Sequence, residues 1–146
     1  MQAPPFALFG IDHIVLRVRD LPRSLHFYGA LLGCALEREQ PELGLTQLRA
    51  GRSLIDLVTL AGPLGAGEPP GPGRNVDHFC LTLAPFDEAA LSAWFSAQGV
   101  TLETPATRYG AEGEGRSFYL QDPDGNRVEL KGARDEETRP RQGREL

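Results

Sequence analysis

The sequence has 146 residues and is poor in cysteine, lysine and long apolar runs. Its two cysteines, Cys34 and Cys80, are too few for a disulfide framework, so we expect a reducing, cytoplasmic setting. No stretch approaches the roughly 20 consecutive apolar residues of a membrane span, and the first residues lack the basic and apolar regions of a signal peptide. A net charge of −5 argues against a nucleic acid or an anionic membrane as the partner.

The feature that organises the chain is an internal repeat. Asp12 and His13 open a segment of alternating apolar and other residues, and Asp77 and His78 open a second one 65 positions later. Alternation with period two is typical of a β-strand that buries one face. In both segments the histidine falls opposite the apolar residues, which are Ile14, Leu16 and Val18 in the first copy and Phe79, Leu81 and Leu83 in the second. The two imidazoles therefore hold equivalent positions.

The repeat extends to whole halves of the chain. Each Asp-His strand is followed by a helical pattern that a glycine ends, at Gly33 and at Gly99, and Asp20 can cap the first helix. Three strands are expected after each helix, at 34–39, 46–50 and 53–60 and again at 100–104, 116–121 and 127–131. These assignments predict a leader at 1–9, a βαβββ module at 10–61, a Gly/Pro-rich linker at 62–74, a second βαβββ module at 75–132 and a polar tail at 133–146.

Each module alone would expose one face of its sheet, so the two modules should share a core. The predicted fold class is α+β, with two tandem βαβββ modules forming a curved mixed sheet of eight strands and the helices behind it. Residues that alternate with the apolar strand positions then face the hollow of the sheet. They include His13, Arg17, Asp56, His78, Tyr119, Arg127, Glu129 and Lys131.

Two imidazoles and two carboxylates converge in this arrangement, from His13, His78, Asp56 and Glu129. Such a mixed set of nitrogen and oxygen ligands suits a six-coordinate divalent ion with water in its other positions. The cations on the same face, Arg17, Arg127 and Lys131, could hold an anionic substrate such as a carboxylate or a thioester conjugate. Solvated strand ends are the equally simple alternative for those three.

Several motifs carry a resemblance to a known family. They are Asp12-His13-Ile14, the run Arg19-Asp20-Leu21-Pro22-Arg23-Ser24 with Phe27-Tyr28, Leu32-Gly33, and the run from Phe118 through Asp122-Pro123-Asp124-Gly125 to Leu130. From about residue 10 to residue 131 the chain resembles the vicinal oxygen chelate superfamily. That superfamily includes glyoxalase I, extradiol dioxygenases, methylmalonyl-CoA epimerase, and fosfomycin- and bleomycin-resistance proteins. Its members share a metal scaffold and differ in reaction.

The resemblance implies a metal-dependent enzyme, and most directly a lyase or isomerase of the glyoxalase I type. The ligands of glyoxalase I, a histidine and a glutamate from each half, match His13, Asp56, His78 and Glu129, with aspartate replacing one glutamate. The bound ion would be Ni, Zn, Mn, Co or Fe(II), and Glu129 or Asp56 could act as the base. By analogy the protein would be a homodimer that binds a small-molecule substrate.

Other members of the family suggest other reactions. An extradiol dioxygenase would use His13, His78 and Glu129 as an Fe(II) triad, and Tyr119 matches the acid/base tyrosine of that class. That class also uses a further pocket histidine, whereas the third histidine here, His26, lies on the first helix. A thiol transferase of the fosfomycin-resistance class and a metal-free, drug-sequestering protein are further alternatives.

Overall fold

The structure is a computed structural model, and it describes residues 11–69, 71–72 and 76–133. The predicted leader, most of the predicted tail and part of the predicted linker lie outside these residues. The elements follow the duplicated order that the sequence predicts. The first half contains β1 (His13–Val18), α1 (Leu21–Leu25), η1 (His26–Leu31), β2 (Ala35–Gln40), η2 (Pro41–Leu43), β3 (Leu45–Ala50) and β4 (Ser53–Thr59). The second contains β5 (Phe79–Leu83), α2 (Glu88–Ala97), β6 (Ala106–Gly110), β7 (Gly113–Gln121) and β8 (Arg127–Gly132).

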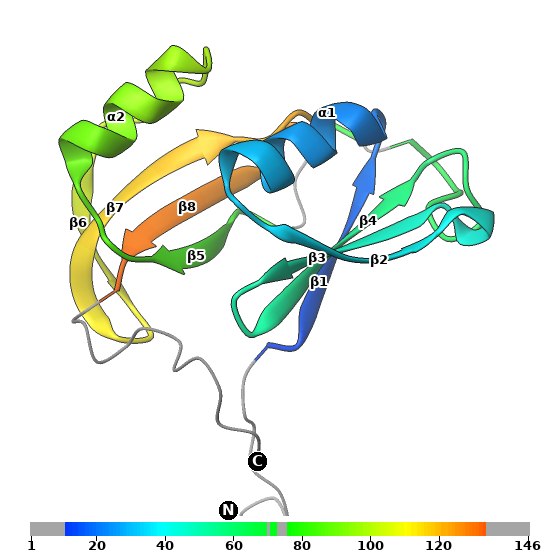
Figure 1. Cartoon of the computed structure of the whole chain (residues 1–146), viewed down its shortest axis with the longest axis horizontal. Coiled ribbons are helices and arrows are strands. Elements are labelled where there is room, and N and C mark those ends of the chain that lie inside the picture. The colour runs from blue at the N-terminus through cyan, green and yellow to red at the C-terminus, as the bar shows by residue number, and fades with distance from the viewer. Residues whose placement is uncertain (1–10, 70, 73–75, 134–146) are drawn as a thin grey trace, which may run out of the picture.

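The two halves have the same sheet topology. The first forms a four-stranded sheet in the order β1-β4-β3-β2, and the second forms one in the order β5-β8-β7-β6. In each sheet the first strand runs parallel to the last, and the remaining pairs are antiparallel. The predicted α+β class with two βαβββ modules is confirmed. Within the described residues the strands form two separate four-stranded sheets rather than one continuous sheet of eight (Figure 1).

Both helices begin where an aspartate caps them. The side chain of Asp20 accepts a hydrogen bond from the backbone N–H of Arg23, and Asp87 does the same for Ala90. The first helix widens into the π-helical turn η1 before Gly33 ends it with φ of 78°. None of the helices in the described part of the chain is long and apolar enough to cross a membrane.

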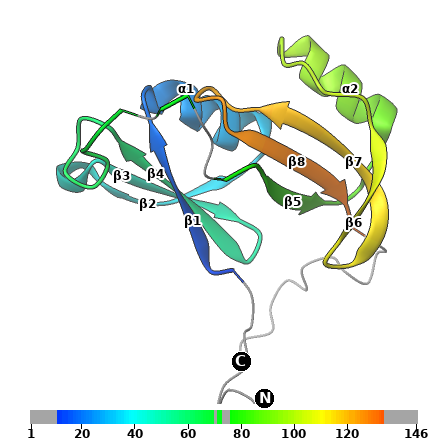
Figure 2. The same ribbon diagram turned by 180° about the vertical axis from the view of Figure 1, so that it is seen from behind.

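The halves share one core on the helix side of the sheets. The side chains predicted to face the helices do so, and Val18, Ile55, Leu57, Val128 and Leu130 are each at most 2% exposed. Figures 1 and 2 show α1 above the region where the two sheets meet and α2 above the second sheet. The core cluster accordingly takes members from both halves, which are Leu16, Val18, Phe27, Tyr28, Leu31, Leu48, Ile55, Leu57, Phe95, Leu120, Val128 and Leu130.

A buried polar network also joins the halves. The hydroxyl of Tyr28 in η1 donates to Asp122 Oδ2 at 2.6 Å, at the start of the turn between β7 and β8. The same carboxylate accepts hydrogen bonds from Asn126 and from the backbone of Asp124, which fixes the Asp-Pro-Asp-Gly turn. Because the Tyr28 and Asp122 side chains are both buried, this link orients the second sheet on the first helix.

One predicted strand is wrong. The sequence predicts a strand at 100–104, but residues 101–105 lie in no helix or strand, and β6 begins only at Ala106. Pro105 lacks a backbone N–H and cannot donate to a ladder, so the regular ladder with β7 starts after it, and before it the N–H of Glu103 donates to the Tyr119 carbonyl at 2.9 Å. Strand β7 correspondingly begins at Gly113, three residues before the predicted start, and forms a hairpin with β6.

Candidate functional site

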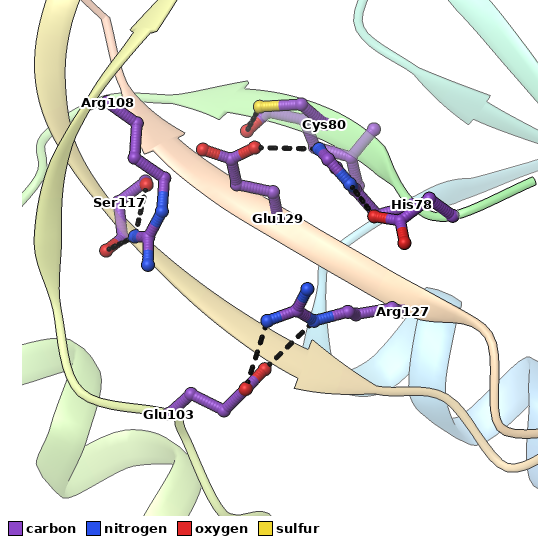
Figure 3. A network of polar contacts seen from close by, with 9 residues as sticks. His78, Cys80, Glu103, Arg108, Ser117, Arg127 and Glu129 are labelled. Carbon is purple, nitrogen blue, oxygen red and sulfur yellow. Dashed lines mark hydrogen bonds and ion pairs between the residues drawn. The ribbon is translucent and has the colours of Figure 1, made fainter.

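The second half carries a compact polar cluster on the face of its sheet that points away from the helices. We call this surface the polar face. It includes His78 and Glu129 (Figure 3), and Tyr119 lies beside them. His78 Nε2 lies 3.2 Å from Glu129 Oε2, and the imidazole meets the Tyr119 ring edge-on with centroids 5.1 Å apart. Tyr119 and Glu129 are direct cross-strand partners, and Glu129 is only 6% exposed. The predicted inward orientation of these three residues is confirmed by their contacts.

The first half places its equivalent pair in the same way. Val15 on β1 is the ladder partner of Asp56 on β4, so His13 lies on the same face as Asp56, two positions along β1, and the Asp56 charge acts on its imidazole. Asp56 is 5% exposed, and its Oδ2 accepts a hydrogen bond from Gln47 Nε2 at 3.0 Å. Its Oδ1 is buried and has no hydrogen-bond partner among the described residues. A buried carboxylate oxygen in this state is costly unless a cation or a donor binds it.

Each histidine is held by the aspartate that precedes it. His13 Nδ1 lies 2.6 Å from Asp12 Oδ1, and His78 Nδ1 lies 2.7 Å from Asp77 Oδ2. The hydrogen bond to Asp12 raises the pKa of His13, and the charge of Asp56 adds to that effect. A carboxylate on Nδ1 fixes the tautomer that leaves Nε2 as the free ligand atom, which is how metal-binding histidines are commonly oriented. The Asp-His dipeptide repeats in the sequence, but the alternation of apolar residues indicates no role for the two aspartates.

These donors fit a divalent ion chemically. Two oriented imidazoles and two buried carboxylates, one with an orphaned oxygen, are the mixed ligands that such ions accept. Within the described part of a single chain, however, no three potential ligands come together at one point. His13 with Asp56 and His78 with Glu129 instead form two pairs, one on each sheet. Neither pair alone supplies enough ligands for a tight site.

Residues of both halves line one cavity. A cavity of about 630 Å³ is lined by Val15 and Arg17 of β1 and by His78 and Arg127 of the second half. Arg17 Nε donates to the carbonyl of Gly65, while its Nη2 is buried without a partner among the described residues. Arg17 therefore brings an incompletely satisfied cation to this cavity.

The other two predicted substrate-binding cations have partners that the sequence did not reveal. Arg127 donates to both carboxylate oxygens of Glu103, at 3.1 and 3.0 Å, and stacks on the Tyr119 ring at 3.7 Å. Lys131 is 6% exposed, and its Nζ donates to the carbonyl of Gly113 at 2.9 Å. Both lie on the predicted face, but neither points freely into solvent.

Arg108 is a further polar-face residue, and no predicted strand contains it. It reaches from β6 across the sheet, and its guanidinium lies 4.3 Å from the Tyr119 ring centroid. No sequence signal could have found it, because the predicted strand lay before Pro105. Burial and the Glu129 charge raise the pKa of Tyr119, although Arg108 and Arg127 oppose the shift. Tyr119 is therefore a neutral hydrogen-bond donor at pH 7.

Cys80 also lies on the polar face, opposite Glu129 in the ladder. The residue is exposed. Desolvation of the thiol and the Glu129 charge raise its pKa to about 11. A thiol with so high a pKa is a poor nucleophile at neutral pH.

Comparisons with known proteins identify the family to which the chain belongs. Residues 10–130 match the family model of the Glyoxalase/Bleomycin resistance protein/Dioxygenase superfamily. The chain belongs to this superfamily. It is 30% identical to virulence protein STM3117 of Salmonella typhimurium over 125 residues, which cover 82% of this chain and 81% of that protein. It is 31% identical to glutathione transferase FosA of Serratia marcescens over 126 residues, which cover 84% and 80% of the two chains.

A solved structure confirms the fold. A protein from the mobile metagenome of V. Pseudocholerae superposes with a TM-score of 0.70 at 29% identity, covering 89% of this chain and 98% of the other. Members of the superfamily bind small-molecule substrates, often as enzymes that use divalent metals.

Proposed function

We propose that the protein is a metal-dependent enzyme that moves a proton on a small oxygen-chelating substrate, as lyases and isomerases of the glyoxalase I type do. The observation that carries this proposal is the pair of equivalent half-sites. In each, an aspartate holds the Nδ1 of a histidine, and a buried carboxylate on the same face interacts electrostatically with the imidazole. A structural role would not require the same constellation twice at matching strand positions.

The ligands in this proposal are His13, Asp56, His78 and Glu129. Once bound, a divalent ion such as Ni, Zn, Mn, Co or Fe(II) would supply Lewis-acid polarisation of the substrate oxygens. In this proposal Glu129 accepts the substrate proton, which is supported by a carboxylate that is largely excluded from water and adjoins the neutral phenol of Tyr119. Asp56 is the alternative base.

The substrate in this proposal carries an anionic group. Arg17, with its buried and unpartnered Nη2, faces the cavity between the sheets, and Arg127 lines the same cavity. Lys131 adds a further positive charge, on the polar face. Together they favour a negatively charged ligand in the neighbourhood of the two half-sites.

We further propose that a homodimer completes the metal site. Each chain keeps its two ligand pairs on separate sheets, so a second copy can bring the first half of one chain against the second half of the other. Val15, which lies beside the first pair on β1 and is 50% exposed, offers apolar surface for such a contact.

A mixing experiment tests both parts of the proposal. His13→Ala and Glu129→Ala each remove one ligand from a different half, and neither variant should bind metal tightly by itself. After the two are refolded together, heterodimers combine the intact halves, and elemental analysis should recover about one quarter of the wild-type metal. Metal in the wild type without recovery in the mixture would place the site within one chain and overturn the dimer. If the wild-type protein binds none of the five ions, the proposed metal site is wrong.

A second candidate is a metal-dependent thiol transferase. It is favoured by the 31% identity to glutathione transferase FosA, together with the His13, His78 and Glu129 set that such an enzyme would use. Metal-loaded protein should be assayed with glutathione and either methylglyoxal or an epoxide. Isomerisation of the hemithioacetal supports the main proposal, whereas glutathione addition to the epoxide supports the transferase.

A further inference from the structure

Three cations lie on the polar face of the second sheet, beside the His78–Glu129 pair. They differ in how many of their N–H groups are already hydrogen-bonded to neighbouring residues. Arg127 uses Nε and Nη2 together to hold the Glu103 carboxylate. A guanidinium binds a carboxylate side-on through this edge. In Arg127 the edge is already occupied by Glu103. Arg127 is thus a support for Tyr119 rather than an open anion site.

Lys131 is enclosed by the β6–β7 hairpin. Its stem and amine pass so close to Gly110 and Gly115 that a Cβ at those glycines would lie 3.3 Å and 3.1 Å from Lys131 atoms. Its Nζ donates to the carbonyl of Gly113 on the same hairpin. The positive charge therefore contributes to the local field, but the amine is not presented to a ligand.

Arg108 differs from both. Its Nη1 donates to the backbone carbonyl of Ser117 at 2.9 Å and to the Ser117 hydroxyl at 2.8 Å (Figure 3). These two bonds use Nη1 and leave the edge formed by Nε and Nη2 open. None of the ion pairs among residues 11–69, 71–72 and 76–133 includes Arg108.

We propose that Arg108 binds a carboxylate of the substrate side-on through Nε and Nη2, and so sets the preference for an anionic substrate. Ser117 and the Tyr119 ring fix the guanidinium before the ligand arrives, so little side-chain freedom is lost on binding. The open edge lies on the same face as His78 and Glu129, where the reacting part of the substrate would bind. The catalytic meaning of this subsite rests on the proposed function, but carboxylate binding itself needs no metal.

Acetate is the probe that tests the subsite on metal-free protein. The Nε–Hε resonances of ¹⁵N-arginine-labelled protein are followed during titration with sodium acetate at constant ionic strength, with chloride as the competing anion. The Arg108 signal, assigned by its loss in the Arg108→Lys variant, should shift saturably with acetate and not with chloride. Arg108→Lys should weaken acetate binding, followed by calorimetry, about tenfold because an ammonium cannot bind side-on.

The matched control is Arg116→Lys. Arg116 lies on the same hairpin but pairs with Glu88 on α2, away from the polar face. It should leave acetate binding unchanged. A flat Arg108 signal, a shift of Arg127 in its place, or an equal loss in both variants would overturn the proposal. His78→Ala should still bind acetate if the subsite exists, so failure of the metal site would be seen separately.

Discussion

The two halves of the molecule share a chain order and a sheet topology but differ in what surrounds their ligand pairs. In the first half, Asp56 has one oxygen on Gln47 and one buried oxygen with no partner among the described residues. In the second half, Glu129 contacts His78 directly and adjoins Tyr119. The two halves thus keep equivalent polar residues at matching positions, while in the second half an aromatic ring, Tyr119, with Arg108 and Arg127 over it lies beside the pair.

The largest expected effect comes from removing a ligand of the second half. His78→Ala should weaken metal binding more than about 100-fold, because even the loss of an outer partner of a metal-bound histidine costs 10–100-fold. Elemental analysis after dialysis against a weak chelator measures it. His26→Ala is the matched control, since His26 is exposed on η1 and should leave metal content unchanged. Equal metal content in the two variants would remove His78 from the site.

The aspartates that hold the histidines should matter next. Asp77→Asn and Asp12→Asn keep the shape of the side chain but lose the charge that orients Nδ1. Each should weaken metal binding by about 10–100-fold without loss of fold. Competition titrations with a colorimetric chelator give the affinities. If only one of the two variants shows the loss, the two halves do not contribute equivalent ligands.

The contact between the halves can be weakened separately from the site. Tyr28→Phe leaves the Asp122 carboxylate short of one buried hydrogen bond, and this should lower the free energy of unfolding by about 1–3 kcal/mol. Urea unfolding monitored by Trp94 fluorescence measures the change. Tyr109→Phe, at a residue that is 84% exposed, should have no effect. An unchanged free energy of unfolding in Tyr28→Phe would show that the polar network does not hold the halves together.

The smallest effect concerns the unpartnered oxygen of the first half. Asp56→Asn removes a buried charge and should stabilise the metal-free protein by about 1 kcal/mol, while reducing stabilisation by added metal. Glu129→Gln should not stabilise the metal-free protein, because Glu129 already has His78 as a partner. Thermal unfolding with and without metal distinguishes the two. Destabilised metal-free Asp56→Asn protein would mean that the carboxylate is satisfied in solution.

Much of the fold could be predicted because its signals are local. Alternation along β1 and β5 assigned the buried faces correctly, and Asp20 marked the first helix start. The missed strand β6 shows the limit, since the regular ladder starts only after Pro105, beyond the apolar residues that suggested a strand. Nothing in the sequence indicated two separate sheets rather than one. Whether the edge strands β1 and β5 pair with each other depends on the tertiary packing.

For the candidate site, the sequence predicted which strand face each residue lies on but not which partners it has. Parity placed His13, Asp56, His78 and Glu129 on strand faces opposite the core, since side-chain direction in a strand depends only on position along it. The alternation pattern could not show that Arg127 is hydrogen-bonded to Glu103 or that the Arg108 guanidinium lies over the Tyr119 ring. Those partners are 24 and 11 residues away in the chain, and only folding brings them into contact.

The sequence by itself therefore determined the duplication, the faces of the strands and the identity of the polar groups on them. The tertiary structure decided which of those groups are satisfied and which remain open. The physical reason is range: period-two burial acts between neighbouring residues, whereas hydrogen bonds and ion pairs of buried side chains depend on distant segments meeting. Asp56, Arg17 and Arg108 are chemically ordinary in the sequence, and their incomplete pairing in the folded chain makes them candidates for binding.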